Sequence, residues 1–142
     1  MNPLYSNKEA LSFLRRRLYA GVIFAIFFIA IDTVAGKLSW YWIFKWIDIP
    51  MHIIGGLIAG YFGILLWHMI VWVHGKGVLS LEEIKSNSKV VLPAIVLAII
   101  VGICWELLEF YFDLSGLDPI RRADTIFDLF NDTFGGVLAI GA

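Results

Sequence analysis

Three aspartates lie four residues apart in an otherwise apolar segment at the C-terminal end: Asp124, Asp128 and Asp132. Each residue of an α-helix advances about 100° around the axis, so side chains at this spacing share one face. Carboxylates gathered on one face can ligate a cation or transfer protons. The opposite face carries Ile126 and Phe130, which suit lipid or packing. The segment therefore predicts a helix with one chemically active side.

Two other apolar segments carry polar pairs at helical spacing. Asp48 and His52 are four residues apart at the start of one segment, and Glu106 and Glu109 are three apart near the end of another. Residues three or four apart are neighbours on a helix surface. Each pair can therefore direct both of its side chains at one point.

Small residues follow His52 at regular intervals. Gly56 and Gly60 form a G-x-x-x-G pattern, which is typical of helices that approach each other closely in membranes. The face that carries Asp48 and His52 is therefore predicted to be buried against a neighbouring helix.

The composition indicates an integral membrane protein. Of the 142 residues, 60% are hydrophobic, against about 45–50% in soluble domains, and they occur in long runs. We predict one all-α domain over residues 1–142, a four-transmembrane-helix bundle. The predicted spans are residues 18–35, 49–74, 90–112 and 124–142. The net charge of −1 and the lack of a dense basic run give no indication of a nucleic-acid partner.

The acidic residues are predicted to collect on one side of the membrane. Four antiparallel spans place nine of the twelve acids there, whichever side faces out. The basic residues favour a cytoplasmic N-terminus by the positive-inside rule, with seven on one side against four on the other. The C-terminus of a four-span chain is then also cytoplasmic, and the acidic end is extracytoplasmic.

A divalent metal ion is the simplest explanation for this many acids at one level. An intramembrane carboxylate costs about 2.5–3.5 kcal/mol even on the lenient insertion scale. Carboxylates with one imidazole suit Zn²⁺, Mn²⁺ or Fe²⁺, and a set of carboxylates alone suits Mg²⁺ or Ca²⁺. The predicted ligands are Asp48, His52, Glu106, Glu109, Asp128 and Asp132, with Asp124 peripheral.

Three functions are compatible with such a site. The first is a metal-dependent enzyme that acts on a membrane lipid or a lipid-linked envelope substrate, with Glu109 or Asp132 as general base. In this reading Arg121 and Arg122 bind a phosphate or carboxylate of the substrate. The second is a protein that binds or transports a cation. The third is a non-catalytic envelope protein whose polar network only fixes the packing of the helices.

The order of these motifs resembles the VanZ-like family of small membrane proteins, and the chain is also similar to YjdF-type membrane proteins. VanZ-like chains carry D-x-x-x-H, then E-x-x-Q, then an arginine followed by D-x-x-x-N-x-x-G. Asp48 and His52 match the first motif, Glu106 matches the second, and Arg122, Asp128 and Gly135 match the last. Glu109 and Asp132 replace the glutamine and the asparagine of that pattern, so this chain is more acidic. The resemblance implies an architecture and a site rather than a reaction.

Overall fold

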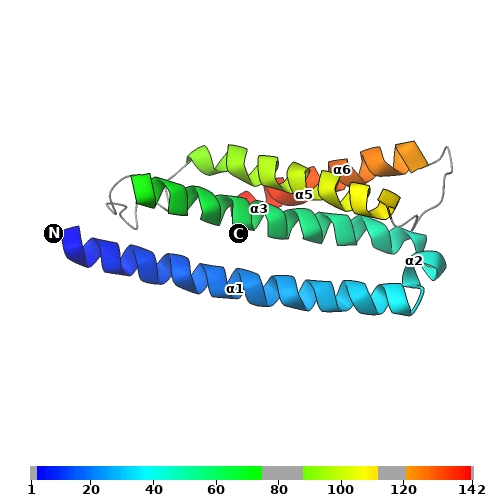
Figure 1. The fold of residues 1–142 in the computed structure, drawn as a ribbon, viewed down its shortest axis with the longest axis horizontal. Coiled ribbons are helices and arrows are strands. Elements are labelled where there is room, and N and C mark those ends of the chain that lie inside the picture. The colour runs from blue at the N-terminus through cyan, green and yellow to red at the C-terminus, as the bar shows by residue number, and fades with distance from the viewer. Residues whose placement is uncertain (1–2, 75–87, 112–120, 142) are drawn as a thin grey trace.

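The computed structural model describes residues 3–74, 88–111 and 121–141, and these residues are almost entirely helical (Figure 1). The α-helices are α1 (Pro3–Lys37), α2 (Trp40–Ile43), α3 (Asp48–His74), α5 (Val91–Tyr111) and α6 (Arg121–Leu138). Short 3-10 turns are η1 (Lys45–Ile47), η2 (Ser88–Val90) and η3 (Ala139–Gly141). The predicted all-α class is confirmed.

Three of these helices are long and apolar enough to cross a membrane. They lie at Lys8–Lys37, Lys45–His74 and Val91–Tyr111. Large apolar side chains are exposed along them, such as Ile23, Phe27 and Leu92, as expected where lipid is the solvent. These three candidate spans overlap the first three predicted ones, although α1 begins well before residue 18. The predicted count of four is not confirmed, because α6 carries five charged residues and lacks the composition of an ordinary span.

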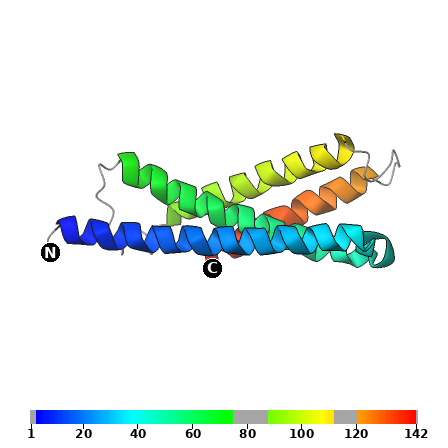
Figure 2. The same cartoon turned by 60° about the horizontal axis from the view of Figure 1, so that its bottom comes forward.

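Helix α3 is central, with α1 on one side and α5 and α6 on the other (Figures 1 and 2). Glycines make the contact between α3 and α6 possible. A Cβ atom on Gly56 would lie 2.6 Å from the Cα of Asp132, and one on Gly60 would lie 2.7 Å from the Cα of Gly136. Both distances are shorter than any real contact, so the backbones meet where side chains would otherwise stand. This confirms that the face below His52 is buried against a neighbouring helix.

The contact between α1 and α3 is built around Tyr61. Its hydroxyl donates a hydrogen bond of 3.1 Å to the carbonyl of Arg17, and the Arg17 guanidinium lies 5.3 Å from the centre of the Tyr61 ring. Arg17 also lies 5.4 Å from the centre of the Phe13 ring. Gly21 leaves the space that the Tyr61 ring occupies. This arrangement stabilises an arginine at an apolar helix surface by cation–π attraction.

One end of the bundle gathers the acidic segments. The end of α1, the start of α3, the end of α5 and the start of α6 lie together at the right of Figure 1, beside α2. Asp32, Asp48, Glu109 and Asp124 are on these helix ends. The predicted collection of acids at one end is confirmed for the described residues, and Asp113 and Asp118 lie outside them. We refer to this region as the acidic end.

Candidate metal centre

Helix α3 places the first two polar residues at its N-terminus. Asp48 already has helical backbone angles (φ −60°, ψ −44°), so it is the first residue of the helix rather than an extended N-cap. His52 follows one turn later, and its Nε2 lies 3.7 Å from Asp48 Oδ1. The side chain of Asp48 is 33% exposed, whereas that of His52 is only 6% exposed. The imidazole is therefore buried one turn inside the bundle from a partly exposed carboxylate at the start of α3.

Helix α6 brings two buried aspartates against that imidazole from the other side. Asp128 Oδ1 lies 3.8 Å from His52 Nε2. Asp132, one turn later, has both carboxylate oxygens 3.3 Å from His52 Nδ1. The two aspartates therefore lie next to different nitrogens of the same ring. The other side of α6 faces outward, since Ile126 and Phe130 are 67% and 68% exposed, as the helical spacing predicts.

Asp48, His52 and Asp128 form a group that could hold a metal ion. Each offers one ligand atom, and these atoms all lie within 4.8 Å of one another. Ligand atoms bound to a common Zn²⁺ at about 2.0–2.2 Å lie about 3–4 Å apart. The distances of 3.7 and 3.8 Å from Nε2 to the two carboxylates fall in this range. They are too long for hydrogen bonds, so Nε2 has carboxylates around it without a direct bond to either.

Helix α5 contributes two glutamates that differ in their hydrogen bonding. Glu106 Oε1 is buried and has no hydrogen-bond partner among the residues described. Glu106 interacts electrostatically with Asp48 and Asp128, so it lies beside the group without belonging to it. Glu109 instead accepts a hydrogen bond of 2.8 Å from Trp105 Nε1 on its own helix. An unbonded buried carboxylate oxygen is costly, so Glu106 is the α5 residue that most requires a partner.

Asp124 and the two arginines of α6 lie at the rim. Asp124 is exposed in the first turn of α6, where a carboxylate is favoured by the helix dipole. Arg121 and Arg122 begin the helix, but their side chains lie outside the described residues. Their predicted role in binding a substrate anion therefore stays a prediction.

Tyr41 is a polar residue of this region that the sequence did not single out. Its hydroxyl donates a hydrogen bond to Asp32 Oδ1, which joins α2 to the end of α1. Burial, with the bond to Asp32 and the nearby carboxylates, raises the pKa of the Tyr41 phenol well above its usual value. In the sequence Tyr41 lies in "GKLSWYWIFKW", whose aromatic composition is that of a membrane interface. That composition predicts an interfacial position and gives no sign that Tyr41 meets a carboxylate.

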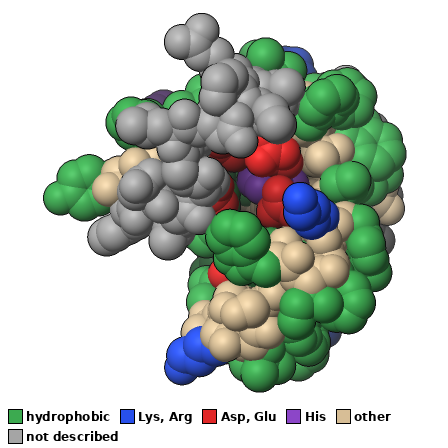
Figure 3. Space-filling model, turned by 90° about the vertical axis from the view of Figure 1, so that its right-hand side faces the viewer, with side chains coloured by type: hydrophobic (Ala, Val, Ile, Leu, Met, Phe, Trp, Pro, Cys, Tyr) green, Lys and Arg blue, Asp and Glu red, His purple; other side chains and the backbone are tan. Residues whose placement is uncertain are grey.

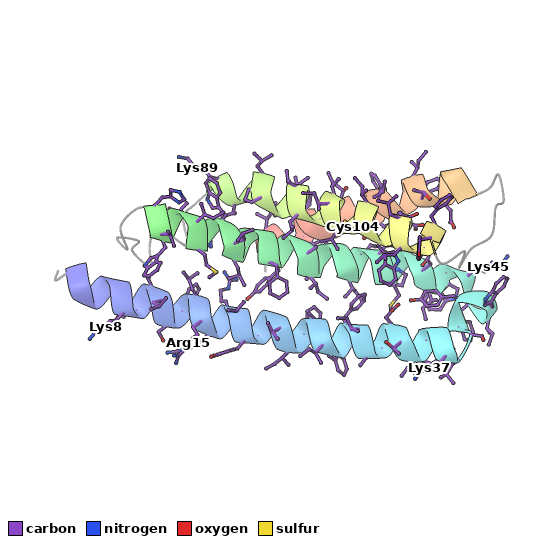
Figure 4. The ribbon with its side chains drawn as sticks, viewed as in Figure 1. Lys8, Arg15, Lys37, Lys45, Lys89 and Cys104 are labelled. Atoms are coloured by element: carbon purple, nitrogen blue, oxygen red, sulfur yellow. The ribbon has the colours of Figure 1, made fainter. Side chains whose placement is uncertain are left out.

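The acidic end is visible from outside the molecule. Figure 3, viewed along the bundle, shows acidic side chains and histidine together near its centre. Lys37 and Lys45 lie at this same end, whereas Lys8, Arg15 and Lys89 lie toward the other (Figure 4). This division of basic residues follows from the antiparallel course of α1, α3 and α5.

The comparisons with known proteins agree with a membrane protein and leave its activity open. A family model described as "Predicted membrane protein (DUF2238)" matches residues 10–142. This match confirms the YjdF-type resemblance and gives no support to the VanZ-like one. No curated protein and no solved structure matches the chain. Because the model covers nearly the whole sequence, the chain belongs to the DUF2238 family of predicted membrane proteins.

Proposed function

We propose that this protein is a four-span membrane protein that binds a divalent metal ion at its acidic end through Asp48, His52 and Asp128. One observation carries the proposal. The buried Nε2 of His52 faces two carboxylates at 3.7 and 3.8 Å, which is ligand spacing rather than hydrogen-bond spacing. One nitrogen and two carboxylate oxygens suit Zn²⁺ or Mn²⁺ better than Mg²⁺ or Ca²⁺.

The charges of the site also favour a bound cation. Five acidic groups among the described residues contribute to the electrostatics around His52: Asp48, Glu106, Asp124, Asp128 and Asp132. Removing carboxylates from water costs several kcal/mol each unless a cation and hydrogen bonds compensate. His52 alone supplies at most one positive charge. A divalent ion beside Nε2 would offset two of the carboxylates and give the buried oxygen of Glu106 a nearby positive charge.

The proposal that α6 is the fourth span rests on how far it extends along α3. Ile64, Val90, Ala94 and Ala139 pack into one buried cluster. Ala139 begins η3, directly after α6, whereas Val90 directly precedes α5 and Ala94 lies near its start. The C-terminal end of α6 and η3 therefore packs beside the start of α5. Helix α5 is itself long and apolar enough to cross a membrane. Helix α6 and η3 thus cover the same depth as a candidate span, with their charged face turned toward α3 and α5 instead of lipid.

Metal analysis of the purified protein tests the binding proposal. We expect the wild type, loaded with Zn²⁺ and desalted, to retain one ion per chain by elemental analysis. Asp128→Ala should lose the ion, because it removes one of three ligands. Asp124→Ala is the matched control, since it removes an exposed aspartate one turn earlier on the same helix face. A wild type without metal, or an Asp128→Ala variant that retains it, would exclude the proposed site.

A second candidate function, hydrolysis of a membrane lipid or lipid-linked substrate, is favoured by Glu106. A metal ion can lower the pKa of a bound water and make it a nucleophile at neutral pH. Oε1 of Glu106 has no hydrogen-bond partner in the described part of the chain and lies beside the ligand group, so it can act as the acceptor that a general base requires. We propose Glu106 as general base in place of Glu109 and Asp132. Glu109 already accepts a hydrogen bond from Trp105, and Asp132 is already paired with His52.

Lipid turnover by variants in proteoliposomes tests this second candidate. Glu106→Gln should retain the metal ion and lose hydrolysis, whereas Asp128→Ala should lose both. Glu109→Gln should leave hydrolysis largely intact. Full turnover by Glu106→Gln would show that Glu106 is not the general base. Full turnover by Asp128→Ala would show that hydrolysis does not need the metal ion.

A further inference from the structure

The geometry points to Asp132 as a positioning residue that holds His52 by Nδ1 and so presents Nε2 to the metal ion. This inference rests on the proposed metal site and assigns Asp132 a role different from that of a ligand. The sequence placed Asp128 and Asp132 in one ligand set, because they share a helix face. The structure separates them by which ring nitrogen each one meets.

The two nitrogens of an imidazole ring direct their bonds away from each other. Asp132 meets Nδ1 with both carboxylate oxygens at 3.3 Å, while Asp48 and Asp128 lie around Nε2. An ion bound at Nε2 is therefore on the far side of the ring from the Asp132 carboxylate. Asp132 is correspondingly absent from the group whose ligand atoms lie within 4.8 Å of one another.

Two glycines hold Asp132 in this place. Its backbone packs directly on Gly56 of α3, and its carboxylate occupies the space above Gly102 of α5. A Cβ atom on Gly102 would lie 3.0 Å from Asp132 Cγ and closer still to Oδ2. The side chain is only 6% exposed, so neighbouring atoms surround the carboxylate where it meets Nδ1. Helices α3 and α5 thus shape a cradle for a carboxylate that contacts only one side of the ring.

A carboxylate in this position controls how histidine binds metal. A metal-ligating histidine almost always donates its other N–H to a carboxylate, carbonyl or water, which sets the tautomer and the ring orientation. Loss of such a partner typically costs 10–100-fold in metal affinity without removing a ligand. Loss of a ligand, in contrast, changes the coordination of the ion itself.

Cobalt binding by the full-length protein in detergent separates these two roles. The affinity for Co²⁺ and the visible d–d spectrum at saturation are measured for the wild type, Asp128→Ala, Asp132→Ala and Asp132→Asn. We expect Asp132→Ala to bind Co²⁺ about 10–100-fold more weakly with an unchanged saturated spectrum. Asp132→Asn should recover part of the affinity, because its amide oxygen still accepts from Nδ1–H. Asp128→Ala should alter or abolish the spectrum.

Gly102→Ala tests the same role without altering any polar group. Its new methyl group would displace the flexible Asp132 carboxylate rather than a backbone, so the protein should fold and bind Co²⁺ more weakly with the wild-type spectrum. Gly55→Ala is the matched control, because its Cβ would meet only Phe28 at 3.8 Å. This variant also keeps the inference testable if Asp132→Ala does not fold.

The possible outcomes separate the positioning role of Asp132 from the proposed metal site on which it rests. No Co²⁺ binding by the wild type overturns the metal site and the role of Asp132 together. Binding by the wild type, with an Asp132→Ala spectrum changed like that of Asp128→Ala, makes Asp132 a ligand and overturns only the positioning role. Unchanged affinity in both Asp132→Ala and Gly102→Ala also overturns that role and leaves the metal site standing.

Discussion

Asp132 and His52 are 80 residues apart in the chain, and their side chains meet at 3.3 Å across the contact between α6 and α3. Both side chains are buried, at 6% exposure each. The backbone of Asp132 is also the place where Gly56 lets α3 and α6 touch. The polar site and the closest helix packing in the bundle are therefore one structure, so a change in either should affect the other.

Metal binding should stabilise the fold, and this effect should depend on Asp128. A ligand that binds only the folded state stabilises it by about 2.7 kcal/mol at 100 times its dissociation constant. We expect Zn²⁺ to raise the midpoint of thermal unfolding in detergent, and a chelator to reverse the rise. Asp128→Asn should show no rise, whereas Asp124→Asn should behave as wild type. Equal rises in all three proteins would indicate binding somewhere else.

Enlarging Gly56 should destabilise the bundle far more than enlarging its neighbour. In Gly56→Ala the new methyl group meets the backbone of Asp132, which cannot rotate away, so α6 must move. Overpacking of this kind costs about 1–3 kcal/mol. Gly55→Ala makes only an ordinary contact with Phe28 and should be nearly neutral. Unfolding by added denaturing detergent measures both, and equal stabilities would contradict the close α3–α6 contact.

Tyr41 should make the protein sensitive to high pH. The pKa of its phenol is raised on folding, so its contribution to stability is complete below the unfolded value of about 10. That contribution is lost as pH rises above this value, because the unfolded state releases the proton first. We expect Tyr41→Phe to be less stable than wild type near neutral pH and to lose less stability between about pH 10 and 12.

Unfolding at several pH values measures this difference, with Tyr19→Phe as control. Tyr19 is 59% exposed on α1 and should have no such effect. A wild type whose stability falls in alkali by the same amount as that of Tyr41→Phe would show that the bond to Asp32 has no energetic role.

The orientation of the bundle can be read from single cysteines. Cys104 is the only cysteine, so Cys104→Ser provides a background for one cysteine at a time. A membrane-impermeant maleimide added to intact cells should label Lys37→Cys, because the positive-inside rule predicts an extracytoplasmic acidic end. Lys8→Cys should stay unlabelled until the cells are opened. Labelling of Lys8→Cys alone would reverse the predicted orientation.

A cysteine near the other end of the chain tests the fourth span. If α6 crosses the membrane, Gly141→Cys should behave like Lys8→Cys and stay protected in intact cells. Labelling of Gly141→Cys together with Lys37→Cys would show that α6 enters from the acidic end without crossing.

The sequence by itself determined the elements and the faces that carry the site. Apolar runs of membrane length predicted four spans, and the structure has three helices of that kind, because the thickness of the bilayer sets how many residues a helix needs to cross it. The four-residue spacing of Asp128 and Asp132 and the glycines after His52 predicted which helix faces meet, because periodicity is a local property of one helix. These inferences needed no knowledge of how the helices are rotated against one another.

Only the tertiary structure decided which partner each polar group has. Asp128 and Asp132 are equivalent by spacing, yet one meets Nε2 of His52 and the other meets Nδ1. Glu106 and Glu109 share a face, yet only Glu109 is bonded to Trp105. Such differences depend on the register between helices, which close contacts at Gly56 and Gly102 set to within the size of one methyl group. A pattern along one helix carries no information about that register, because register belongs to the packed pair.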